Sequence, residues 1–358
     1  MPRPAPTTAR GGASRRHSPA SSDAALAAAI LPDGPDTVDA AVASLRRACM
    51  NGRSALLACT STLEGVLAAI GIAYLAHVDE EHVRLVDAAC AQPRLDENVV
   101  GPFPLDDRTL ALAGRVWRGL NLHVATGCPR SRENRCPGTC AGSCVSKVAY
   151  ACAADDPSVP EAVHRYVRLA FKEGPAIANM MSNPAVVRLD SLARLVLNEC
   201  ERTRQFARFS RLADGSYLAS FRPAADTVPF VAGHFAQRMG PERFCLVDPV
   251  HCVAAVHEAG QKRCRIIRLD QTLADELAAR DDFAADEQYV RAMWKRLYDG
   301  LALDGRGKEE RGYDLRASWM PKRFWGDLPE LDPRNGNPGA HVPKRYQGAR
   351  KDALEDGS

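Results

Sequence analysis

Four cysteines in the stretch CPRSRENRCPGTCAGSC are the residues whose type and spacing most directly suggest chemistry. Cys128, Cys136, Cys140 and Cys144 are separated by seven, three and three residues, among prolines and glycines. Four thiolates this close together can hold zinc in a tetrahedral site. The loop has little apolar material, so a bound metal would supply its missing folding free energy. The pattern predicts a structural zinc site; an iron–sulfur cluster with the same ligands, or thiols without metal, are the alternatives.

A second set of residues could carry acid–base chemistry. A histidine and a carboxylate that share a cleft can exchange protons with a substrate, which makes His234 and Asp248 candidates for catalysis, with Glu199 nearby. In the alternative, Arg202 or Arg238 forms a structural ion pair with one of these acids, and His234 packs in the core.

Basic residues cluster in three places that could meet a nucleic acid, one of which is a predicted strand and its flank with Lys262, Arg263, Arg265 and Arg268. Arg202, Arg204 and Arg208 lead from a helix into a hairpin. Residues 291–325 carry nine cations and five acids, an excess greater than the net charge of +3 of the whole chain. Such a surface can release counterions from phosphates, and an arginine or tryptophan plane can stack on an unpaired base. The alternative is a solvated helix face with intrahelical ion pairs.

The stretch LRASWMPKRFWGDLPEL contains both apolar aromatic residues and basic residues. We expect most of its aromatic side chains, such as Phe324, to pack in the core, because each would stabilise the fold by roughly 1.5–3 kcal/mol when buried. Lys322 and Arg323 are expected to face outward as part of the cationic surface, with Trp325 as the ring that contacts nucleic acid.

The elements that position these residues follow from the periodicity of apolar side chains. A helix is predicted to start at Leu63 after the capping residues Thr60–Ser61–Thr62, and Asp226 is the expected N-cap of another. Apolar residues also have helical spacing in 36–50, 106–120, 157–174, 185–206, 226–240 and 285–303. In 185–206, Leu195 is predicted to lie on the apolar face. A hairpin around Asp214–Gly215 and three later strands are predicted in 243–250, 251–260 and 262–269.

This order predicts an α+β fold in which a helical N-terminal half packs with a mostly antiparallel sheet. We expect a single domain over 36–331, with a cysteine-rich insertion at 121–147 and disordered tails at 1–35 and 332–358. No apolar run is long enough to predict a membrane span. The remaining cysteines are scattered singly, as in a cytoplasmic protein with buried thiols.

Three blocks of the sequence resemble a bacterial family of DNA-metabolism and DNA-repair proteins. They are RLVLNECERTRQFARFSRLADGSYLASFRPAADTVPFVAGHFAQRM, FCLVDP and MWKRLYDGLAL with the LRASWMPKRFWGDLPEL stretch that follows it. A fourth, TSTLEGVLAAIGIAY, is similar to the family's opening segment, so the resemblance covers roughly residues 55–331. His251 stands where an arginine is common in that family.

The resemblance implies a partner more than a reaction. Members of that family accompany a radical-SAM protein of DNA modification or repair, and some are fused to a uracil-DNA glycosylase-like domain. We therefore expect a factor that binds DNA and acts with a radical-SAM partner. An enzyme acting on a damaged or flipped base, and a scaffold whose basic face meets an acidic protein, are the alternatives.

The cysteine cluster gives a direct prediction. Elemental analysis of the purified protein should find about one zinc ion per chain, since four thiolates complete one tetrahedral site. A visible absorption spectrum separates this outcome from an iron–sulfur cluster. A folded protein without metal would contradict the proposed site.

Overall fold

The structure is a computed structural model that describes residues 37–124, 144–300 and 322–329. It contains many helices and two separate β-sheets, which confirms the α+β class. None of the described helices is long and apolar enough to cross a membrane. The two predicted tails lie outside the described residues.

The chain divides into two compact units. The first takes in residues up to 135 together with 157–179, and the second takes in 136–156 together with everything from 180 onward. Each unit holds one of the sheets. The single domain expected over 36–331 stays a prediction.

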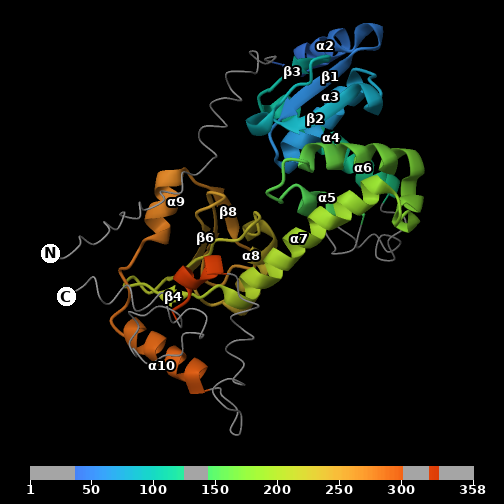
Figure 1. Cartoon of the computed structure of the whole chain (residues 1–358). Helices are drawn as coiled ribbons and strands as arrows, with labels where there is room; N and C mark the ends of the chain where they lie inside the picture. Colours follow the sequence, from blue (N-terminus) through green and yellow to red (C-terminus); the bar gives the residue numbers. More distant parts are fainter. Residues whose placement is uncertain (1–36, 125–143, 301–321, 330–358) are drawn as a thin grey trace, which may run out of the picture. The chain divides into compact units, whose positions relative to one another are not determined.

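The first unit is built on a parallel sheet in which β1 lies between β2 and β3 (Figure 1). Parallel neighbours need a crossover connection, which α3 supplies between β1 and β2. The elements of this unit are α2 (Val38–Ala48), η1 (Met50–Gly52), β1 (Ser54–Cys59), α3 (Leu63–Leu75), η2 (Glu80–His82), β2 (Val83–Asp87), η3 (Ala88–Cys90), β3 (Glu97–Val100), α4 (Asp107–Val124), α6 (Val159–Glu173) and η5 (Gly174–Asn179).

The core of the first unit consists of β1 and α3. Helix α3 begins as predicted, because the Thr62 hydroxyl accepts a hydrogen bond of 3.1 Å from the Gly65 N–H. All residues from Gly65 to Ala73 are buried, as is β1 except at its first residue. The apolar run before Thr60 predicts a short strand, which is β1, but β2 and β3 were not predicted, because short strands of a buried parallel sheet lack the alternation that identifies a strand.

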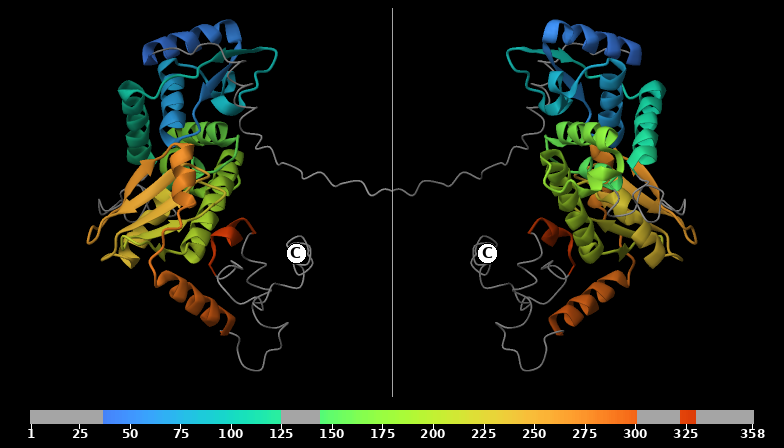
Figure 2. Two further views of the ribbon diagram at one scale, coloured as in Figure 1. Left: turned by 90° about the vertical axis from the view of Figure 1, so that its left-hand side faces the viewer. Right: turned by 90° about the vertical axis from the view of Figure 1, so that its right-hand side faces the viewer.

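The second unit contains a five-stranded sheet in the order β4-β5-β6-β7-β8 (Figure 2). All neighbouring strands pair antiparallel except β5 and β6, so the mostly antiparallel sheet is confirmed. The elements of this unit are α5 (Ser146–Ala151), α7 (Pro184–Phe206), β4 (Ser210–Arg211), β5 (Tyr217–Ser220), α8 (Val228–Arg238), β6 (Phe244–Asp248), β7 (Val253–His257), β8 (Arg265–Arg268), α9 (Gln271–Ala278), α10 (Glu287–Gly300) and η6 (Lys322–Asp327).

The exceptional pair β5 and β6 determines where polar residues gather. Helix α8 connects the two strands, and their carboxyl ends therefore lie at the same edge of the sheet. Ser220 ends β5 and Asp248 ends β6, and Arg222 follows β5 by two residues. This edge carries most of the buried polar side chains considered below.

Three details of the second unit differ from the sequence-based expectation. The N-cap of α8 is Thr227, whereas Asp226 forms an ion pair of 2.8 Å with Arg268. Leu195 is 43% exposed, because the buried stripe of α7 runs through its neighbours Leu192 and Val196. Helix α9 was not predicted; it covers one face of the sheet, where its Leu277 packs with residues of β5, β6 and β7.

Candidate functional site

The carboxylate of Glu199 lies at the centre of a buried ion-pair network in the second unit. Its side chain is only 3% exposed, and both oxygens accept hydrogen bonds of 2.6 Å from Arg323. Arg202 and the Ala224 N–H also donate to it, the latter at 2.9 Å. Burial alone would raise the pKa of Glu199, but these donors outweigh it and hold the pKa below its usual value. Glu199 is therefore an ionised structural partner.

Segment η6 is attached to the rest of the second unit by two ion pairs, to one of which it contributes the cation and to the other the acid, and by one aromatic contact. Arg323 binds Glu199, while Asp327 accepts from Arg222. Between them, Phe324 is fully buried and stacks on Phe221 with ring centroids 4.2 Å apart. The predicted burial of this aromatic is confirmed.

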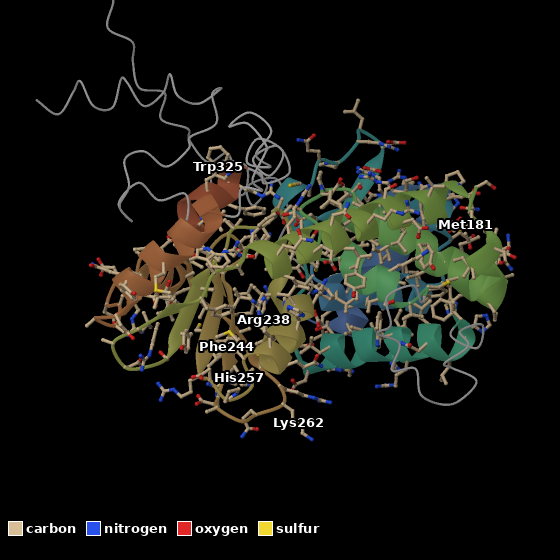
Figure 3. The ribbon with its side chains drawn as sticks, turned by 90° about the horizontal axis from the view of Figure 1, so that it is seen from below. Met181, Arg238, Phe244, His257, Lys262 and Trp325 are labelled. Carbon is tan, nitrogen blue, oxygen red and sulfur yellow. The ribbon has the colours of Figure 1, made fainter. Side chains whose placement is uncertain are left out.

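Two arginines that were expected to contact nucleic acid form ion pairs with Glu199 in this network. Arg202 and Arg323 both donate to Glu199, so the ion-pair alternative describes them. Arg204 pairs with the neighbouring Glu201 at 2.5 Å. Trp325 lies on η6, apart from Arg238 (Figure 3). The side chain of Lys322 lies outside the described part of the chain.

The acid–base candidates do not come together as proposed. Asp248 is bound by His251 rather than by His234: its Oδ2 lies 2.6 Å from Nδ1 of His251, and its Oδ1 accepts from the backbone of Val250 and His251. The other ring nitrogen of His251 lies 3.1 Å from Asp155. His234 is exposed on α8 and forms no hydrogen bond or ion pair with any other described residue.

His251 is a cation held between two carboxylates. Burial alone would lower its pKa, but the hydrogen bonds and charges of Asp155 and Asp248 prevail and raise the pKa to about 10. Both ring nitrogens then act as donors, which leaves no lone pair for a general base near neutral pH. Burial raises the pKa of Asp248, against the opposing hydrogen bonds from His251.

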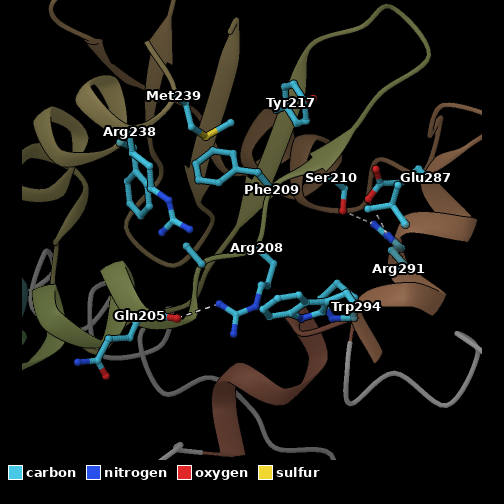
Figure 4. Close-up of a pocket in the computed structure, with 14 residues that line it drawn as sticks. Gln205, Arg208, Phe209, Ser210, Tyr217, Arg238, Met239, Glu287, Arg291 and Trp294 are labelled. Carbon is cyan, nitrogen blue, oxygen red and sulfur yellow. Dashed lines mark hydrogen bonds and ion pairs between the residues drawn. The ribbon is translucent and has the colours of Figure 1, made fainter. Parts of the chain in front are cut away.

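A cavity of about 490 Å³ lies in the second unit beside β4, α8 and α10 (Figure 4). Aromatic rings and arginines dominate its wall. The described residues that line it are Gln205, Ala207, Arg208, Phe209, Ser210, Tyr217, Phe235, Arg238, Met239, Glu287, Val290, Arg291, Trp294 and Pro329.

The three arginines of this cavity differ in how they are held. Arg291 is fixed as part of the wall by Ser210 at 2.6 Å and by Glu287 at 3.3 Å. Arg208 donates to the Gln205 carbonyl at 2.8 Å and lies over the Trp294 ring at 5.4 Å.

Arg238, by contrast, is exposed at the end of α8 and has no hydrogen bond or ion pair among the described residues. Its guanidinium points into the same space as that of Arg208 (Figure 4). The cavity therefore offers a cation with unused donors beside aromatic rings.

Of the residues predicted to bind nucleic acid, Arg208 is the one that this cavity contains. Sequence reasoning treated Arg238 only as a structural partner and did not single out Phe209, Tyr217 or Trp294. A tryptophan in the basic segment MWKR was a usable signal, but the approach of α10 to the hairpin was not visible in the chain order. Exposure of Trp294, 38%, shows that its ring is not absorbed into the core.

The cysteine cluster falls mostly outside what the structure covers. Cys144 is half-buried, and Cys128, Cys136 and Cys140 lie outside the described residues. Among the residues that are described, no three histidine, cysteine or acidic side chains are grouped to hold a metal ion. The zinc site stays a prediction.

Comparison with protein families assigns most of these residues to one domain. Residues 157–330 match DUF4130, a domain of unknown function. The DUF4130 match contains the Glu199 network and every described residue of the cavity, and of the His251 bridge it omits only Asp155. No curated protein matches the chain.

The bridge of His251 between Asp155 and Asp248 predicts a specific pH dependence of stability. The folded-state pKa of His251 is about 10, against an ordinary value of 6.5, so the stabilisation is complete below about pH 6.5 and is lost as pH rises toward 10. Urea unfolding of the wild type and of His251→Gln should therefore show a difference in unfolding free energy that shrinks steadily across this range. A difference that stays constant or grows with pH would contradict the bridge.

Proposed function

We propose that this chain is a DNA-metabolism or DNA-repair factor that binds unpaired nucleotides of DNA at the cavity between Arg208, Arg238 and Trp294. The observation that carries the proposal is Arg238, an exposed guanidinium with no partner among the described residues, at the mouth of an aromatic-walled cavity. A guanidinium with unused donors suits a phosphate oxygen, which accepts its charge-assisted hydrogen bonds.

The aromatic wall of the cavity suits the base of a nucleotide. Tyr217, Phe209 and Trp294 present apolar faces, and stacking of a base on such a ring is worth roughly 1–3 kcal/mol without regard to sequence. Three arginines against the single acid Glu287 make the described lining cationic, although the chain as a whole has a net charge of only +3. Local placement of charge, rather than total charge, supports a polyanionic partner.

The family resemblance extends the proposal beyond the cavity. It supports a bacterial, cytoplasmic factor that acts together with a radical-SAM protein of DNA modification or repair. Binding is the activity proposed here, because His251, which lies beside the buried Asp248, is already paired on both ring nitrogens.

Fluorescence anisotropy with a labelled oligothymidylate and with a duplex, over a salt series, tests the proposal. The wild type should prefer the single strand, because only unpaired bases can stack in the cavity. Trp294→Ala should weaken binding by about 1–3 kcal/mol. Arg238→Ala should reduce the slope of log K against log salt by about 0.7, as expected for one phosphate contact with a single strand.

Arg263→Ala is the matched control, because Arg263 is exposed and belongs to neither cavity wall described here. It removes the same charge and should leave the affinity close to that of the wild type. An equal loss in Arg263→Ala would show that general basicity carries the binding. Absence of salt-dependent binding in the wild type would end the proposal.

A further inference from the structure

A second, more polar cavity of about 750 Å³ adjoins the first in the same unit. The two share Arg208, Ser210, Arg291 and Pro329 as lining residues. A nucleotide held at the shared arginines can therefore reach into either space. The residues that belong to the second cavity alone decide what part of a ligand it accepts.

Two polar atoms on the wall of the second cavity are buried without a hydrogen-bond partner among the described residues. They are the Oγ of Ser220 and the Oδ2 of Asp327. The side chain of Asp327 is only 7% exposed, and its other oxygen accepts from Arg222. A buried polar atom without a partner destabilises a fold by about 1–3 kcal/mol, so such atoms are normally satisfied by a protein group, an ordered water or a ligand.

The hydrogen-bonding capacity of the Ser220 and Asp327 oxygens restricts the kind of ligand group that can bind there. The pair with Arg222, which follows β5 by two residues, holds Asp327, and Ser220 ends β5; both residues line the second cavity. A carboxylate oxygen accepts hydrogen bonds, and a serine hydroxyl can accept or donate. The lining carries Arg208, Arg280 and Arg291 as well as Asp281 and Asp327, so its net charge does not decide the ligand. The two unpartnered oxygens favour a group that carries N–H donors. Burial raises the pKa of Asp327, against the opposing effect of Arg222, and loss of its charge would not remove its ability to accept.

Nucleobases differ in this respect. Adenine, cytosine and guanine carry an exocyclic amino group with N–H donors, whereas the single edge donor of thymine is flanked by two carbonyl oxygens. Those carbonyls would face the Asp327 oxygen and be repelled. This wall would therefore distinguish thymine from the other bases by the groups on the edge of the base, and not by the stacking face of its ring.

We propose that the second cavity receives the edge of the unpaired base and that Ser220 and Asp327 select bases with an exocyclic amino group over thymine. This inference rests on the proposed function, because it assigns the base edge within the same nucleotide-binding site. Selection and overall affinity are carried by different residues: Ser220 and Asp327 for the former, Arg238 and Trp294 for the latter.

Competition by the pentanucleotides TTXTT, with X as adenine, cytosine, guanine or thymine, against labelled oligothymidylate tests the selection. The three amino-bearing bases should compete about 3- to 10-fold better than thymine in the wild type, the effect of one added hydrogen bond. Ser220→Ala should reduce this preference by removing a hydrogen bond to the amino-bearing bases. Asp327→Asn should reduce it as well, because removing the charge that repels the thymine carbonyls raises the affinity for TTTTT relative to the other three. Asp281→Asn, an exposed acid on the same wall, should retain the preference.

The outcomes separate the two proposals. Salt-dependent binding of oligothymidylate with equal competition by all four pentanucleotides would overturn the selection and leave the proposed function intact. No binding of oligothymidylate would overturn both. Asp327→Asn also weakens the ion pair with Arg222. If the Asp327→Asn protein does not fold, Ser220→Ala alone tests the proposal. A base preference that persists in Ser220→Ala would overturn the role of this wall.

Discussion

A carboxylate withdrawn from water must receive strong hydrogen bonds at both oxygens, and this requirement organises the second unit around Glu199. Its donors are Arg202 one helical turn later, the Ala224 N–H after β5, and Arg323 from 124 positions further along the chain. The last of these attaches η6 to α7. The stacked rings of Phe221 and Phe324 and the Arg222–Asp327 pair then hold the same segment at the carboxyl end of β5.

The attachment of η6 places the walls of both cavities. Pro329 lines each of them, and Asp327 contributes the unsatisfied oxygen of the second. The network also separates the basic residues into two kinds. Arg202 and Arg323 share the carboxylate of Glu199, whereas Arg238 has no hydrogen bond or ion pair among the described residues and lines the aromatic cavity. A count of cations along the sequence cannot make this distinction, because pairing depends on residues that meet only in the fold.

Several local signals in the sequence were confirmed, whereas long-range partners were not visible in it. The start of α3 at Thr62, the end of α6 at Gly174 and the turn at Gly215 follow from caps and a positive φ that neighbouring residues dictate. Burial of Phe324 followed from its apolar character. Its neighbour Arg323 was assigned to the surface and is 36% exposed, but nothing local indicates that it also pairs with a carboxylate on α7. The aromatic cavity was missed for the same reason.

His251 shows why the predicted acid–base pair did not form. Between Asp155 and Asp248 it is a cation with both ring nitrogens hydrogen-bonded. The sequence-based search for a proton-transfer partner of Asp248 selected His234 instead, which is exposed on α8.

The most direct test of the account is a double-mutant cycle between Glu199 and Arg323, measured by chemical unfolding of the wild type, Glu199→Ala, Arg323→Ala and the double variant. A direct buried ion pair predicts a coupling free energy of about 1–3 kcal/mol, while the parallel cycle between the exposed Glu201 and Arg323 should give a value near zero. A Glu199–Arg323 coupling no larger than that of the Glu201 cycle would contradict the attachment of η6 through Glu199.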